Sequence, residues 1–344
     1  MKAIRRPAAI AVIVLTMTAL LAAPATARRL RGVPQWARPA VSYLADKGWI
    51  DLSSFDAKAP MTRAAFTRLM RKAYGGGFKR TKGKVTAGEV SAALVKKLGF
   101  GGLARSLRTV RSPDGWNPRV GKRFGSEILS RELGLRRDHP TNQEGFEARA
   151  GDPMIQADVA WALWQAKTSP DEYSAQALSG FQLSNYSGKR RKVVRFALSL
   201  VGTPYVWGGE WNARTPSGYP FGAQAAGGMD CSGFVWFVMQ KKSSTYSPPG
   251  RSYTGWSIPQ RSSYDMAKAA RTKLRLRQMR PGDIAFFAPN GRRSKASDVY
   301  HAGIYLGHGW MIHSSGSRAG VSLANIGRGA WWHSQLAWGR RIIR

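Results

Sequence analysis

The chain has 344 residues, with 54 lysines and arginines against 19 aspartates and glutamates, and its formal net charge is +35. A hydrophobic content of 43% is enough for packed cores and excludes a disordered polycation. The single cysteine, Cys231, excludes an internal disulfide framework, a Cys-x-x-Cys redox pair and any multi-cysteine metal site. The positive charge indicates an anionic partner.

Residues 1–27 have the pattern of a secretory signal peptide. A basic start precedes an apolar run over residues 8–23, and the small residues Ala25 and Ala27 fit a cleavage site. The apolar run has about 16 residues, whereas a spanning helix needs about 20. We therefore expect cleavage and export, with no stable membrane insertion afterwards; an uncleaved membrane anchor is the alternative.

Residues 33–168 are predicted to form a helical domain with three similar units. A helix start and an apolar helix face recur from Met61, Val85 and Met154. Thr62 is placed as the N-cap of the helix in the first unit.

Three helix–loop–helix units of this size resemble the S-layer homology (SLH) domain, a module that attaches exported proteins to cell-wall polymers. The family's binding motif is Thr-Arg-Ala-Glu. This chain has Thr62-Arg63-Ala64 but replaces the acid with Ala65, and the other two units lack the arginine. The resemblance implies an all-α domain; a plain helical bundle that packs against the second domain is the alternative.

Residues 169–190 are rich in serine, glycine and polar side chains and are predicted to be a linker. Residues 191–344 differ in composition and pattern, with many glycines and short alternating apolar runs that predict strands. This segment has 22 basic and five acidic residues, a local net charge of +17. The positive charge is therefore spread over both predicted domains.

Cys231 follows a glycine-containing loop and precedes an apolar run that predicts a buried helix. Asp230 fits the N-cap, so Cys231 falls in the first helical turn, where unpaired backbone N–H groups and the helix dipole favour a thiolate. A thiolate is the nucleophile that cysteine chemistry requires. A small apolar core residue is the alternative.

Three of the five histidines, His301, His308 and His313, lie in one predicted hairpin that turns at 307–309. A three-residue loop would pair Leu306 with Trp310 and place His313 opposite Gly303. His301 and His313 would then be diagonal neighbours on one face, where one imidazole can orient the other. A two-residue loop would place them on opposite faces.

These positions predict a catalytic triad of Cys231, His301 and His313. His301 would take the thiol proton and later protonate the leaving amine, and His313 would fix its tautomer. Backbone N–H groups at the start of the helix could stabilise an oxyanion. A metal site on the two histidines is the competing idea, but no third ligand is evident. We expect no metal and no cofactor.

Several sequence blocks occur in the order seen in the NlpC/P60 cell-wall cysteine peptidases, and residues 191–344 therefore resemble that family. The blocks are Tyr205-Val206-Trp207-Gly208-Gly209, Asp230-Cys231-Ser232-Gly233, Arg280-Pro281-Gly282-Asp283-Ile284, His301-Ala302-Gly303-Ile304-Tyr305-Leu306-Gly307 and Ile312-His313. The resemblance implies an α+β, papain-like domain in which an antiparallel sheet carries a nucleophile helix. It assigns the nucleophile to Cys231, the base to His301 and the orienting residue to His313.

The same resemblance implies hydrolysis of peptidoglycan stem peptides, between D-γ-glutamate and a diamino acid. It implies that Tyr205 lines the site and that Asp230 and Ser232 contact the amino end of the stem peptide. The chain departs from the family in a long segment, 210–229, between the first two blocks, and in a polar stretch, 241–263, after the helix. Both could border the cleft.

The leading hypothesis is thus a secreted, cell-wall-associated cysteine endopeptidase whose partners are peptidoglycan and anionic wall polymers. An amidase or acyltransferase on the same fold is one alternative, because the pocket selects the bond. A non-catalytic, cationic wall-binding protein is another. We expect no nucleic-acid partner, since no recognised motif accompanies the charge. Most of the tryptophans Trp310, Trp331, Trp332 and Trp338 are interpreted as packing residues, with a position in the cleft as the alternative.

Overall fold

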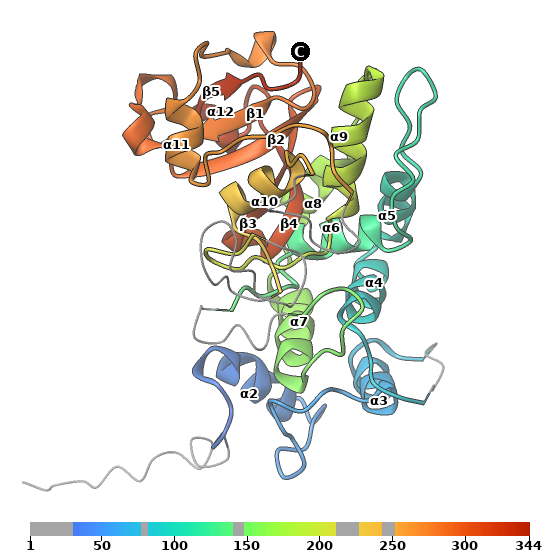
Figure 1. Cartoon of the computed structure of the whole chain (residues 1–344). Helices are drawn as coiled ribbons and strands as arrows, with labels where there is room; N and C mark the ends of the chain where they lie inside the picture. Colours follow the sequence, from blue (N-terminus) through green and yellow to red (C-terminus); the bar gives the residue numbers. More distant parts are fainter. Residues whose placement is uncertain (1–29, 77–81, 140–147, 211–226, 243–251) are drawn as a thin grey trace, which may run out of the picture.

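The computed structural model describes residues 30–76, 82–139, 148–210, 227–242 and 252–344 (Figure 1). The predicted signal peptide and residues 211–226 of the long segment lie outside these ranges. Within the described residues, no helix combines the length and apolarity needed to span a membrane.

The first part of the chain is helical, as predicted (Figure 1, blue to green). Its helices in the described residues are α2 (Arg38–Asp46), α3 (Arg63–Tyr74), α4 (Ala87–Lys97), α5 (Gly101–Arg108), α6 (Phe124–Glu132) and α7 (Gln156–Thr168). Helix α2 packs against α7, and α6 packs against both α4 and α5.

The entries to α3, α4 and α7 meet in a closed ring of backbone hydrogen bonds. The Met61 N–H donates to the Met154 carbonyl (2.8 Å), the Met154 N–H to the Val85 carbonyl (3.0 Å), and the Val85 N–H to the Met61 carbonyl (2.9 Å). These are the same three residues at which the sequence units begin. The repeat therefore corresponds to a pseudo-threefold arrangement of helix starts.

Local capping explains where two of these helices begin. The Thr62 hydroxyl accepts from the Ala65 N–H at 3.1 Å. Thr86 and Glu89 form a reciprocal capping box on α4, which satisfies two otherwise unpaired donors. The third start, Ile155, has no side-chain cap.

The second part is built on one antiparallel sheet in the order β4-β3-β2-β1-β5. The strands are β1 (Ile284–Phe287), β2 (His301–Gly307), β3 (Trp310–Ser315), β4 (Gly320–Asn325) and β5 (Leu336–Arg340). Helix α10 (Cys231–Val238) packs against β2 and β3, so the predicted α+β fold with a helix on an antiparallel sheet is confirmed.

The stretch 169–190, predicted to be a linker, contains helical segments and is anchored by a few buried side chains, although most of its residues are exposed. It contains α8 (Glu172–Ala177) and the start of α9 (Gly188–Ser199). The Tyr186 hydroxyl donates to the Leu306 carbonyl at 2.8 Å, and the Phe181 ring packs edge-on against Trp310. Its polar composition predicted a linker, but a few apolar side chains within it pack against the sheet.

Helix α6 connects the helical part directly to the sheet. The Arg318 guanidinium lies 3.1 Å from the Glu132 carboxylate, and the Ser322 hydroxyl on β4 donates to the same carboxylate at 2.9 Å. One continuous apolar cluster also runs from the helical part through α10 into the sheet. The two parts therefore share a core.

Candidate active site

Cys231 is the first residue of α10, as the sequence predicts. The Asp230 carboxylate caps the helix by accepting from the Gly233 N–H at 2.6 Å. A side chain at Gly233 would clash with the Gly209 carbonyl, which explains why glycine stands there. The close approach brings the 205–209 block against the start of the helix.

The Cys231 thiol lies against the backbone on both sides of His301. Its Sγ is 4.0 Å from the Tyr300 carbonyl oxygen, and the N–H groups of Ala302 and Ser232 favour its charged form. Burial nevertheless raises the pKa of the thiol to about 12, and the Asp230 charge acts in the same direction. The backbone donors at the helix start favour the thiolate, as expected, but desolvation acts against it and is the larger effect.

In the histidine hairpin, the strand pairing near the two histidines is the predicted one, but the length of the turn differs from the prediction. Gly307 pairs with Trp310, so the loop has two residues, and φ is positive at both His308 (50°) and Gly309 (75°), as in a type I′ turn. A bulge between Tyr305 and Gly307 shifts the register by one residue. His308 is exposed at the turn.

The bulge places the two remaining histidines on one face. Past it, Ile304 pairs with Ile312, so His313 falls opposite Gly303, as predicted. His301 Nε2 lies 2.7 Å from His313 Nδ1, a short hydrogen bond. A plain two-residue loop would have separated the two rings; the extra residue restores the register that brings them together.

Both imidazoles are buried and uncharged at rest. Burial lowers the pKa of His301 to about 3, and burial followed by the His301 and Arg318 charges holds the pKa of His313 well below its usual value. The Trp332 ring covers them, with its centroid 4.8 Å from that of His301. Trp332 thus lies at the site against the histidine pair, the alternative to plain packing that its sequence position left open.

Arg261 occupies the region where Asp230 and Ser232 lie. It is within 3.2 Å of the Asp230 carboxylate and 2.7 Å of the Glu210 carboxylate, and it donates to the Ser232 hydroxyl at 2.8 Å. It also donates to the carbonyls of Gly208 and Gly209. The Asp230 charge is therefore already neutralised within the protein.

Tyr205 lies beside the helical part of the molecule. A Cβ placed on Gly316 would be 3.5 Å from the Tyr205 ring and 3.1 Å from Asp138 Oδ2, so the two side chains flank this glycine. Burial raises the pKa of the Asp138 carboxyl to about 6, and Asp138 Oδ1 is buried without a hydrogen-bond partner among the described residues. The helical part therefore places a carboxylate at the edge of the site.

Residues 202–340 match the NlpC/P60 family. Among curated proteins, this part of the chain is similar to the peptidoglycan endopeptidase RipA of Mycobacterium tuberculosis (36% identical over 138 residues, 39% of this chain and 23% of that protein). It is similar to the probable peptidoglycan endopeptidase LytE of Bacillus subtilis (32% over 142 residues, 41% and 31%). It is also similar to the gamma-DL-glutamyl hydrolase of Bacillus subtilis (28% over 174 residues, 48% and 34%). The chain spans only 23% to 34% of the length of these three curated proteins, and 20% of another similar protein.

Proposed function

The C-terminal part of this chain is an NlpC/P60 domain, and from that premise we propose that the protein is a cysteine peptidase that hydrolyses peptidoglycan stem peptides. The observation that carries the proposal is that Cys231, at the start of α10, lies against the backbone on either side of His301, whose ring is hydrogen-bonded to His313. The names of the similar proteins, two of them peptidoglycan endopeptidases, support the substrate class.

In the proposed reaction, His301 accepts the Cys231 proton as the sulfur attacks the scissile carbonyl carbon. The tetrahedral oxyanion is stabilised by backbone N–H groups at the start of α10. Collapse breaks the C–N bond, and His301 returns the proton to the leaving amine, which leaves a thioester on Cys231. A water molecule, deprotonated by His301, then hydrolyses the thioester and regenerates the thiol.

The histidine geometry supports a particular tautomer. His301 Nε2 is engaged with His313 Nδ1, which leaves His301 Nδ1 to act on the thiol. His301 Nδ1 can accept a proton only if Nε2 carries the hydrogen and donates to His313. The proton of His313 then resides on Nε2, which is buried without a partner among the described residues. His313 is thus proposed to act as the acceptor that orients His301.

We propose the bond between D-γ-glutamate and a diamino acid as the site of cleavage. The similarity to a protein named gamma-DL-glutamyl hydrolase favours this bond. Tyr205 is proposed to line the substrate site together with the neighbouring edge of the helical part. Asp230 and Ser232 remain candidate substrate contacts, but their bonds to Arg261 favour a role in shaping the site.

The proposed location is the bacterial cell wall, reached by export. The signal-like residues 1–27 and the net charge of +35 support this location, because the wall offers anionic polymers. The three-unit helical part is proposed to be an SLH-like module, as its ring of helix starts would allow.

The test is digestion of purified cell walls and defined muropeptides, with the products identified by mass spectrometry. The wild-type chain should release fragments cut after D-γ-glutamate, and Cys231→Ala should release none. A Ser199→Ala variant, altered at an exposed hydroxyl on α9, serves as the control and should match the wild type. Products cut between sugar and peptide would instead identify an amidase. Undiminished release by Cys231→Ala would eliminate the cysteine mechanism.

A further inference from the structure

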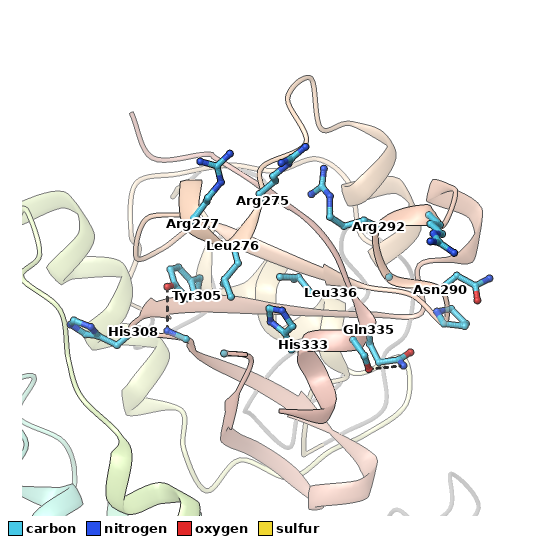
Figure 2. A pocket seen from close by; sticks show the side chains of 16 residues that line it. Arg275, Leu276, Arg277, Asn290, Arg292, Tyr305, His308, His333, Gln335 and Leu336 are labelled. Atoms are coloured by element: carbon cyan, nitrogen blue, oxygen red, sulfur yellow. Dashed lines mark hydrogen bonds between the residues drawn. The ribbon is translucent and has the colours of Figure 1, made fainter. Parts of the chain in front are cut away.

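A second candidate site lies at the hairpin end of the sheet, away from Cys231. It is a cavity of about 1140 Å³ between β5, the Leu276 turn and the 290–293 turn (Figure 2). Figure 2 shows arginines along its rim and His333 and Tyr305 nearer its floor. Its lining includes four arginines and two histidines: Arg275, Arg277, Arg292, Arg293, His308 and His333.

The four guanidinium groups are exposed and have no carboxylate partner among the described residues. Arg292 makes one long hydrogen bond, 3.4 Å, to the Ala337 carbonyl. No acidic residue lines the cavity. Like charges gathered in one concavity repel one another, so an unoccupied cavity of this kind has an unfavourable electrostatic energy that a bound anion would remove.

The acids of this half of the chain are all engaged elsewhere. Residues 191–344 contain five carboxylates. Arg261 binds Glu210 and Asp230. Arg190 and Arg341 bind Asp283. Asp265 accepts from a hydroxyl donor and Asp298 from a backbone donor, each beside a short helical turn. None of these five carboxylates lines the cavity or pairs with its arginines.

The cavity also has an apolar floor. Leu276 and Leu336 lie beneath the arginines, and the Tyr305 hydroxyl accepts from the Gly309 N–H at 3.3 Å, which fixes its ring there (Figure 2). A cationic rim over an apolar floor suits a ligand with anionic groups on a carbon backbone. All four rim cations are arginine, the side chain whose planar fork matches phosphate oxygens.

We propose that this cavity binds a polyanion with repeated phosphodiester groups on a polyol backbone. The phosphates contact the arginine rim, and the carbon backbone lies over Leu276, Leu336 and Tyr305. The cavity volume accommodates several repeats, so that more than one phosphate is bound at once.

The site lies close to the proposed catalytic histidines but is separate from them. Helix α12 (Trp331–Gln335) stands between the two: Trp332 covers His301, whereas His333 and Gln335 face the cavity. Tyr305 is four residues from His301 on β2, roughly 13 Å along the strand. A polymer held here would keep the peptidase beside its substrate; this consequence rests on the proposed function, but the binding itself does not.

The test measures binding of a fluorescent glycerol phosphate oligomer to the full chain by anisotropy, at low and high salt. We expect saturable binding that weakens with salt. The double variant Arg275→Gln/Arg292→Gln should bind at least about tenfold more weakly, since a hydrogen bond to a charged group is worth roughly that factor. The pair Arg277→Gln/Arg293→Gln should show the same loss and provides a second reading if the first variant does not fold.

The matched control is Arg105→Gln/Arg108→Gln, which removes two exposed charges from α5 in the helical part. It should bind within about twofold of the wild type, because exposed, unpaired charges far from a site contribute little. An equal loss in this control and in the rim variants would overturn the proposal in favour of net charge alone. Equally tight binding of poly-glutamate would overturn the assignment to phosphate. Because the readout is binding, failure of the peptidase test does not affect it.

Discussion

At the residue scale, the site combines a neutral thiol with a neutral imidazole. Cys231 has a pKa of about 12 and His301 a pKa of about 3, and in both cases burial is the first cause. Burial therefore favours the neutral form of both groups in the absence of substrate. The proton therefore moves during attack on the carbonyl, when the developing oxyanion and imidazolium compensate each other.

This resting state predicts slow alkylation of Cys231. Only the thiolate reacts, so the rate with iodoacetamide should rise about tenfold per pH unit from neutral pH to beyond pH 9. Mass spectrometry of the intact chain over a pH series measures this rate, with glutathione as a free-thiol reference. A plateau near neutral pH would show a resting thiolate–imidazolium pair and contradict the neutral assignment.

The acceptor role of His313 predicts a difference between two substitutions. His313→Asn keeps an acceptor oxygen and should retain much of the activity. His313→Leu removes the acceptor and should lower kcat on the order of 10²-fold, because His301 loses its orienting partner. KM should change less than kcat in His313→Leu. Equal activity of the two variants in the muropeptide assay would mean that His313 only fills space.

At the element scale, the side-chain arrangement of the hairpin could be predicted from the sequence, but its turn could not. The spacing of His301 and His313 predicts a shared face, and the structure has it. The predicted three-residue loop is wrong, because a two-residue turn and a bulge reach the same register. A bulge has no reliable local signal, since it depends on how the neighbouring strands pair.

The buried position of Arg261 could not be predicted from the sequence. It stands in a polar stretch that was predicted only to border the cleft. In the structure its side chain is mostly buried and joins Gly208, Gly209, Glu210 and Asp230. An arginine in a polar loop is usually exposed, and only long-range contacts decide otherwise. The position of Cys231 at a helix start could be predicted, because the capping residue Asp230 and the close-packed Gly233 are its neighbours in the sequence.

Arg261 therefore holds the block at 205–209 against the start of α10. Arg261→Leu would leave Glu210 and Asp230 buried without their cation and should lower the free energy of unfolding by about 3–5 kcal/mol. Urea titration followed by circular dichroism measures the change. Arg328→Leu, at an exposed position, is the control and should shift stability by less than about 0.5 kcal/mol. A similarly small effect for Arg261→Leu would show that solvent replaces its bonds.

At the scale of the whole molecule, the helical part and the sheet are joined through a buried acid. Glu132 ends α6, lies 3.1 Å from the Arg318 guanidinium and accepts from Ser322. Desolvation raises its pKa to about 7, although Arg318 and Ser322 lower it. Buried side chains of the stretch 169–190 add apolar contacts between the same two parts. The two parts are therefore expected to unfold together.

The Glu132 carboxyl gives this interface a pH dependence whose sign can be stated. Its folded pKa is above the ordinary value of 4.5, so the folded state binds more protons than the unfolded state between pH 4.5 and about 7. Its contribution to stability is then fully present below pH 4.5 and is lost as the pH rises to about 7. The buried His301 acts in the opposite sense over much of this range, because its folded pKa is depressed.

The difference between the wild type and Glu132→Gln isolates the acid, because the histidine contributions cancel. From pH 4.5 to pH 7, the free energy of unfolding of the wild type should fall relative to that of the variant by up to about 3 kcal/mol. Urea titrations at several pH values measure it, and Glu172→Gln on the exposed side of α8 is the control, with no such trend. A difference that stays constant with pH would show that Glu132 is ionised throughout and that Arg318 outweighs desolvation.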